Sequence, residues 1–94
     1  MDHILANEPD ARRYALRIDD QLVSVVDYSI SDNRIALTRT YTLPPHRGHG
    51  YAAEIVEFAV NDIETTTNYR IVSSCWYVGV WFDQHPERDG LLTR

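Results

Sequence analysis

The chain of 94 residues contains no lysine, so its nine positively charged side chains other than histidine are all arginines. It has 14 acidic residues and a formal net charge of −5. Binding to the phosphate backbone of nucleic acids depends on clustered positive charge, so this balance argues against nucleic acid as a partner. The sequence offers no functional explanation for the absence of lysine.

The chain contains a single cysteine, Cys75. A single cysteine cannot form an internal disulfide, which indicates a reducing compartment such as the cytoplasm. No apolar run approaches the roughly 20 residues that a membrane-spanning helix requires. The N-terminus carries Asp2, Glu8 and Asp10 where a signal peptide would have basic and apolar regions. We therefore expect a cytoplasmic protein without membrane contact.

The apolar content suffices for one hydrophobic core. Hydrophobic residues make up 44% of the chain, and a chain of this length cannot divide them between two cores. Residues 1–11 are polar, contain Pro9 and show no sustained period, so we expect a flexible N-terminal arm there. Residues 12–94 are expected to form a single domain, as a monomer or a homodimer.

The first half of this expected domain has the patterns of strands. Apolar residues alternate over 12–18, and β-branched and aromatic residues are frequent over 22–30 and 34–43. Asp19, Asp20 and the segment 31–33 supply turn residues between these runs. Short turns between consecutive strands favour antiparallel pairing, and we therefore expect a three-stranded meander.

Helical spacing follows the Pro44-Pro45 pair. Apolar residues recur at this spacing at Ala52, Ile55, Val56, Ala59, Val60 and Ile63. The segment 70–75 predicts a fourth strand, and Val78, Trp81, Phe82 and His85 predict a second helix that ends at Pro86. Trp76, Trp81 and Phe82 are expected in the core. The predicted fold class is therefore α/β, of the α+β type, in the order βββαβα.

The loop between the third strand and the first helix has the sequence Arg47-Gly48-His49-Gly50-Tyr51-Ala52. Amides of a glycine loop and of the first helical turn lack intrahelical acceptors and lie at the positive end of the helix dipole. Such a loop suits an anion, above all a pyrophosphate, and Arg47 adds a fixed positive charge. A plain strand-to-helix turn with a glycine cap is the alternative interpretation.

The same loop resembles the arginine-glycine-x-glycine-x-alanine signature with which GNAT acetyltransferases hold the pyrophosphate of acetyl-CoA. The segment Cys75-Trp76-Tyr77-Val78, followed by Trp81 and His85-Pro86-Glu87, is similar to the C-terminal half of the short GNAT-like family. The resemblance runs from Tyr14 to Leu92. It implies a minimal GNAT fold that binds acetyl-CoA as its cosubstrate and transfers the acetyl group to an unidentified amine, such as one of a protein or peptide.

This resemblance also implies site residues. The pyrophosphate would bind at Arg47, Gly48, His49, Gly50, Tyr51 and Ala52, and the pantetheine arm would pair with the backbone of Thr40, Tyr41 and Thr42. Cys75 and Tyr77 are the implied catalytic candidates, either of which could protonate the departing thiolate, and Cys75 could also accept the acetyl group. Without the resemblance, Cys75 is a small buried residue and Tyr77 anchors a helix.

One position departs from the short family, which often has a glutamate where this chain has Tyr41. The missing carboxylate leaves the acceptor of the amine proton unidentified. A module that binds acyl-CoA, or a protein partner, without catalysis is therefore the alternative function.

Other site types fit the sequence less well. A dinucleotide-binding fingerprint needs a parallel βαβ unit and an acidic residue about 20 positions after the loop, where this chain has Arg70. A Walker A loop needs a lysine. His46 and His49 have no neighbouring cysteine or carboxylate that would complete a metal site, so no metal is expected.

Overall fold

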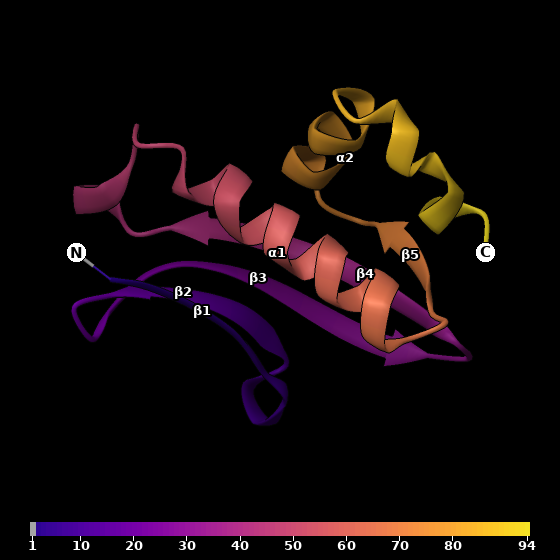
Figure 1. Ribbon diagram of the computed structural model, residues 1–94, viewed down its shortest axis with the longest axis horizontal. Coiled ribbons are helices and arrows are strands. Elements are labelled where there is room, and N and C mark those ends of the chain that lie inside the picture. Colours follow the sequence, from indigo (N-terminus) through magenta and orange to yellow (C-terminus); the bar gives the residue numbers. More distant parts are fainter. Residues whose placement is uncertain (1) are drawn as a thin grey trace.

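A five-stranded sheet forms the frame of the computed structural model, which describes residues 2–94. Its strands are β1 (His3–Glu8), β2 (Arg13–Ile18), β3 (Gln21–Ser31), β4 (Arg34–Thr42) and β5 (Arg70–Ser73), and they lie side by side in this order. Helix α1 (Tyr51–Thr66) crosses one face of the sheet, and α2 (Trp76–Asp83) follows β5 on the same side (Figure 1). Short 3-10 helices occupy Pro9–Ala11, Pro44–His46 and Pro86–Leu92. No helix within residues 2–94 has the length and apolar character needed to cross a membrane.

The predicted mixed class and the antiparallel meander are confirmed, because β2, β3 and β4 pair antiparallel in sequence order. The predicted βββαβα order is incomplete, since β1 precedes the meander. The fourth predicted strand, β5, pairs with β4 in the parallel direction. A parallel neighbour requires a crossover connection, and α1 supplies it.

The expected flexible arm over residues 1–11 is wrong for His3–Glu8. All six residues of β1 pair with β2, from His3 with Ile18 to Glu8 with Arg13. Glu8 also accepts side-chain hydrogen bonds from Arg13 at 2.8 Å and Arg17 at 3.0 Å. The pattern of β1 is weak because only Leu5 packs against the core. Backbone pairing and the Glu8 ion pairs therefore hold a segment that its own apolar pattern does not identify.

Helix α1 presents the predicted stripe to the sheet, and Ile55, Val56, Ala59, Val60 and Ile63 are fully buried. Below the helix, the Tyr14 ring packs edge-on against Phe58, with centroids 6.1 Å apart. Its hydroxyl donates to Asp62 of α1 at 2.7 Å. Because side chains alternate along a strand, the neighbours Arg13 and Ala15 point to the opposite face, which α1 does not cover.

Helix α2 buries Val78, Trp81 and Phe82, as its spacing predicted. His85 lies beyond its end and stacks on Trp81, with ring centroids 4.0 Å apart. The prediction that Trp76 is a core residue is wrong, since it is 81% exposed. It is the first residue of α2 and is not among the residues with which that helix packs on the core.

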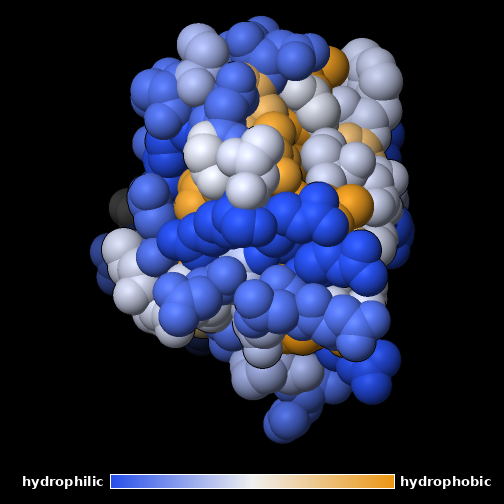
Figure 2. All heavy atoms as spheres, turned by 90° about the vertical axis from the view of Figure 1, so that its right-hand side faces the viewer, coloured by the Kyte–Doolittle hydropathy of each residue, from blue (hydrophilic) through white to orange (hydrophobic). Residues whose placement is uncertain are grey.

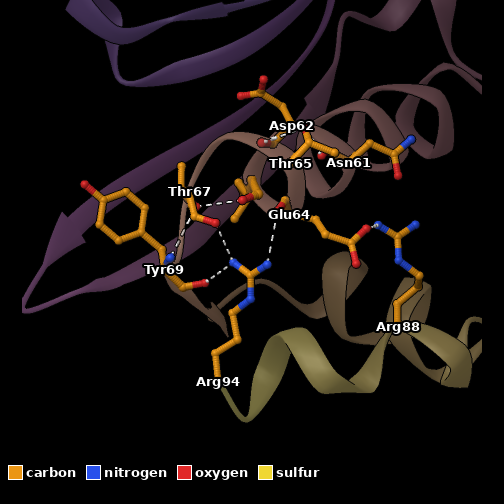
Figure 3. Close-up of polar contacts among 9 residues, drawn as sticks. Asn61, Asp62, Glu64, Thr65, Thr67, Tyr69, Arg88 and Arg94 are labelled. Carbon is orange, nitrogen blue, oxygen red and sulfur yellow. Dashed lines mark hydrogen bonds and ion pairs between the residues drawn. The ribbon is translucent and has the colours of Figure 1, made fainter.

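The C-terminal segment is fastened to the end of α1. The guanidinium of Arg94 donates to the carbonyls of Glu64, Thr67 and Tyr69, at 3.1, 2.9 and 3.1 Å (Figure 3). Arg88 pairs with the Glu64 carboxylate at 2.9 Å. The bonds from Arg94 to Glu64 and Thr67 satisfy carbonyls that the end of α1 leaves without intrahelical partners. Figure 2 views this end of the molecule and shows mostly hydrophilic residues, with apolar atoms visible between them.

Alanine substitutions in β1 test whether this strand belongs to the sheet. Leu5→Ala should lower the free energy of unfolding by about 1 to 2 kcal/mol, because it removes a partly buried side chain from the core. Ile4→Ala is the matched control, since Ile4 is 56% exposed, and should change stability by less than about 0.5 kcal/mol. Urea denaturation measures both. If both substitutions leave the free energy of unfolding unchanged, β1 does not stabilise the sheet and residues 1–11 behave as an arm.

Candidate active site

Strand β5 accompanies β4 along only part of its length. The paired residues run from Arg34 with Arg70 to Leu37 with Ser73. The last hydrogen bond joins the Ser74 amide to the Leu37 carbonyl at 3.1 Å. Beyond it, β4 continues to Thr42 and pairs only with β3. The outer edge of residues 38–42 therefore faces a gap between β4 and the start of α2.

A bulge in β4 determines which backbone groups face this gap. Asp27 pairs with Arg39 and Tyr28 pairs with Leu37, so Thr38 is an extra residue. Farther along, the Leu43 amide donates to the Val23 carbonyl of β3 at 3.0 Å. Because backbone groups alternate along a strand, the amides of Thr40 and Thr42 point away from β3 and into the gap.

The glycine loop follows β4 and leads into α1. Gly48 and Gly50 have φ angles of 86° and 78°, in the left-handed region that glycine adopts without strain. The first intrahelical bond of α1 runs from the Glu54 amide to the Gly50 carbonyl. The amides of Tyr51 and Ala52 precede it and have no intrahelical acceptor. This end of α1 is therefore a donor-rich, electropositive terminus.

A cleft of about 340 Å³ lies between this loop, the end of β4 and α2. Its lining consists of Thr42, His46, Arg47, Gly48, Gly50, Tyr51, Ala52 and Tyr77. The structure thus brings together most of the residues predicted for cosubstrate binding, with Tyr77 opposite them. Sequence reasoning missed His46, which it weighed only as a metal ligand. The position of His46 directly before Arg47 could have indicated that it lies at the same anion-binding loop.

Arg47 is the positive group of the cleft. Its Nε donates to the Thr42 carbonyl at 2.9 Å, which ties the loop to the strand end. Within residues 2–94 it belongs to none of the ion pairs. Its charge therefore remains available to an anion in the cleft.

Four predicted residues lie outside the cleft lining. His49 stacks on the Tyr51 ring, with centroids 5.5 Å apart, and is exposed. Thr40 and Cys75 meet where β4 and β5 separate, and the Cys75 thiol lies 3.6 Å from Thr40 Oγ1. Tyr41, the partner of Val25, lies between the guanidinium groups of Arg39 and Arg47. Cys75 therefore lies at the vertex of the gap, beside the cleft.

The Cys75 thiol occupies the N-cap position of α2. Burial opposes its ionisation, but contacts with the amides of Val78, Tyr77 and Thr40 and with the Thr40 hydroxyl outweigh burial and lower the pKa. The thiol makes no capping hydrogen bond of standard geometry. The lowered pKa thus reflects several weak contacts that together favour the thiolate.

Tyr77 has the opposite tendency, because burial raises the pKa of its phenol. It therefore keeps its proton at neutral pH and can act as a hydrogen-bond donor toward the cleft. Within residues 2–94, no group of three or more histidine, cysteine and carboxylate side chains is placed to hold a metal ion. The polar chemistry of this site comes from amides, Arg47, His46, the Cys75 thiol, the phenols of Tyr51 and Tyr77 and the hydroxyls of Thr40 and Thr42.

The reactivity of Cys75 toward iodoacetamide tests its environment. In the folded protein, the rate should reach half of its maximum at a lower pH than in the unfolded protein, because the lowered pKa keeps the thiolate at lower pH. Thr40→Val, which removes the neighbouring hydroxyl, should move this midpoint upward. The urea-unfolded protein is the control and should titrate at the ordinary value. Identical midpoints for folded and unfolded protein would contradict the proposed stabilisation of the thiolate.

The sequence comparison agrees with this geometry. The model of the GCN5-related N-acetyl-transferase family matches residues 13–91 of the chain, from β2 into the last 3-10 helix. The match includes the glycine loop, the free edge of β4, Cys75 and Tyr77. No curated protein matches the chain. The resemblance expected from the glycine loop and the cysteine segment is confirmed, and the chain belongs to the GCN5-related N-acetyl-transferase family.

Proposed function

We propose that this protein is an acetyl-CoA-dependent N-acetyltransferase. The observation that carries the proposal is the meeting of the glycine loop, Arg47 and the free edge of β4 in one cleft, with Cys75 and Tyr77 beside it. Membership of the family supports acyl transfer in general. The cleft supports the choice of a cosubstrate that has both phosphates and an extended amide-containing arm.

The pyrophosphate of acetyl-CoA would lie over the start of α1. Amides of the first helical turn and of the left-handed glycines would donate to its oxygens, and Arg47 would offset its charge. No acidic side chain lines the cleft to oppose an anion. His46 and His49 at the loop would contact phosphate or solvent.

The pantetheine arm would occupy the gap beside β4. Its amide and carbonyl groups can pair with the backbone of Thr40 and Thr42, as an added strand pairs with an open sheet edge. This direction carries the thioester toward the vertex, where Cys75 contacts Thr40. The cleft is near the small end of ligand sites, which span about 300 to 1,000 Å³, so the adenosine would remain at the surface.

The chemical step would be direct attack by the acceptor. The amine lone pair attacks the thioester carbonyl carbon, the C–N bond forms, the C–S bond breaks and CoA leaves as a thiolate. The amine loses one proton to water, and the CoA thiolate gains one. Cys75 is the favoured proton donor, because its pKa is below that of an ordinary thiol whereas that of Tyr77 is raised. Tyr77 would instead donate a hydrogen bond to the leaving sulfur.

An acetyl-cysteine pathway is the chemical alternative. The Cys75 thiolate would attack the thioester carbon, CoA would leave as a thiolate, and the amine would then take the acetyl group from Cys75. The alternative function is a binding module without catalysis. Tyr41 favours that alternative, because it stands where a carboxylate could take up the amine proton.

Acetyl-CoA and free CoA should both bind with micromolar dissociation constants, about −8 kcal/mol, because the loop contacts the pyrophosphate that they share. Calorimetric titration measures these affinities. Gly50→Asn should weaken both about tenfold or more, since asparagine tolerates the left-handed backbone but places a side chain at the phosphate site.

Gly90→Asn is the matched control, because a side chain there also meets open space and it lies outside the cleft. Unchanged affinity in Gly50→Asn would move the phosphate site elsewhere. Failure of wild-type protein to bind either ligand at millimolar concentration would contradict the proposed function.

Cys75→Ala separates binding from chemistry. The variant should bind acetyl-CoA almost normally but release free CoA thiol in the presence of amines at least about tenfold more slowly, a barrier change of about 1.4 kcal/mol. Tyr77→Phe, which keeps the ring, should have a smaller effect. A purely structural role would lower the melting temperature and leave activity proportional to the folded fraction.

Intact-protein mass spectrometry after incubation with acetyl-CoA tests the acetyl-cysteine pathway, which requires a labile adduct at Cys75. Full activity in Cys75→Ala would remove the thiol from the mechanism. Binding without thiol release over a panel of amines would favour the binding module.

A further inference from the structure

The face of the sheet opposite α1 carries a row of charged residues. Glu8 pairs with Arg13, Arg13 with Asp27, and Asp27 with Arg39, so one row crosses β1 to β4. Cross-strand partners share a face, and Arg13 points away from α1 because its neighbour Tyr14 points toward it. Arg39 therefore lies on the face that no helix covers.

The adjacent row on this face is apolar and ends at Tyr41. Ala6, Ala15, Val25 and Tyr41 are successive cross-strand partners. Ala15 and Val25 are only 1% and 6% exposed although no helix covers them. The neighbouring rows of this face carry arginines, and long charged side chains can cover apolar surface while their ends stay in water.

The positive charges on this face outnumber the negative ones. Arg13, Arg17 and Arg39 stand against the carboxylates of Glu8 and Asp27, on a chain whose net charge is −5. Glu8 is already bound by Arg13 and Arg17. The side chain of Arg39 is 58% exposed, and its guanidinium lies 3.5 Å from the Asp27 carboxylate. An exposed ion pair at this distance is weak. An exposed and weakly paired guanidinium, that of Arg39, therefore lies next to Tyr41.

Arg39 and Tyr41 also border the vertex of the gap. They flank Thr40, which contacts Cys75. The cleft for the cosubstrate opens on the side of α1 and α2, whose residues line it. A second substrate that approaches the thioester from the free side meets Tyr41 and the guanidinium of Arg39, 4.6 Å from the centre of the Tyr41 ring.

No carboxylate lines the cleft, and the carboxylates of Glu8 and Asp27 on the open face are paired with arginines, which limits the amines that can react. Without a base, the acceptor must be partly neutral by itself. A peptide α-amine has a pKa of about 7.7 to 8.0, whereas that of a lysine side chain is about 10.4. At neutral pH, an α-amine therefore offers a neutral fraction several hundred times larger.

Building on the proposed acetyl transfer, we propose that the acceptor is the N-terminal α-amine of an acidic peptide segment, and that Arg39 binds its carboxylate beside Tyr41. Guanidinium groups bind carboxylates through paired, charge-assisted hydrogen bonds. The α-amine nitrogen forms the new C–N bond to the acetyl carbon, the C–S bond of acetyl-CoA breaks and CoA leaves as a thiolate that gains a proton, the amine proton goes to water, and the peptide carboxylate is unchanged. Arg39 is thus a specificity residue, which acts through binding rather than chemistry.

Matched peptides test this proposal with acetyl-CoA and the full chain. One tetrapeptide begins with aspartate and glutamate, its neutral counterpart begins with asparagine and glutamine, and a third has a blocked N-terminus and one lysine. The kcat/KM for the acidic peptide should exceed that for the neutral peptide about tenfold, and the blocked peptide should react at least about a hundredfold more slowly. Product mass identifies the acetylated amine.

Arg39→Gln should remove the preference for the acidic peptide, mainly through KM, and Arg39→Glu should reverse it. Arg34→Gln is the control, since Arg34 is an exposed arginine at the other end of β4 and should keep the preference. Free aspartate is a separate arm, and a rate equal to that of the acidic peptide would overturn the assignment to a peptide.

Calorimetric titration of the same variants with acetyl-CoA distinguishes failure of this inference from failure of the proposed function. Loss of the acidic preference in Arg39→Gln with unchanged acetyl-CoA affinity supports the inference. The inference is overturned if the wild-type protein prefers neutral or lysine-bearing peptides, or if Arg39→Gln keeps the wild-type preference. In both cases the proposed acetyl transfer still stands. Wild-type protein that does not bind acetyl-CoA overturns both.

Discussion

The separation of β4 from β5 is the constraint on which the site depends. Four residue pairs and the bond from the Ser74 amide to the Leu37 carbonyl hold the two strands together, after which they part. Because β4 and β5 are parallel, their C-terminal ends lie at the same end of the sheet. The loop that leads into α1 follows one of these ends, and the start of α2 follows the other. An anion-binding loop, an open strand edge and the Cys75 thiol therefore converge. If β5 continued beside β4, it would pair with the amides of Thr40 and Thr42 and close the gap.

The bulge at Thr38 determines how the residues at the end of β4 are oriented. One extra residue reverses which backbone groups point outward and which side chains point to each face. Thr40 and Thr42 consequently aim their amides at the gap, while Arg39 and Tyr41 turn to the face without helices. In the proposed reaction this arrangement gives each substrate its own side of the sheet, and the two meet only at the vertex. A fold with little material around its sheet can therefore separate the two substrates without an additional domain.

Much of this architecture could be predicted from the sequence, because its signals are local. The stripe of α1, the strands of the meander and the turn at Gly48 and Gly50 each depend on residues that are close in sequence. Strand β1 was missed because Leu5 alone faces the core and the rest of its stability comes from pairing with β2. The contact between Cys75 and Thr40, and the placement of Tyr41 between two arginines, depend on register and on one bulge. No local pattern encodes these, and the apolar side chain of Trp76 likewise gives no local sign that it is exposed.

The polar groups of the site are distributed unevenly between the two halves of the proposed reaction. Amides around Cys75 favour a negative sulfur, and Tyr77 retains a proton that can meet a leaving thiolate. No carboxylate lines the cleft, and Glu8 and Asp27 on the open face are held by arginines rather than placed to take up a proton from the amine. An enzyme built this way lowers the barrier for departure of CoA and leaves deprotonation of the nucleophile to the acceptor and to water. Selectivity then arises from the intrinsic pKa of the acceptor amine and from the charge that it meets at Arg39, so a weakly basic amine on an anionic chain satisfies both conditions at once.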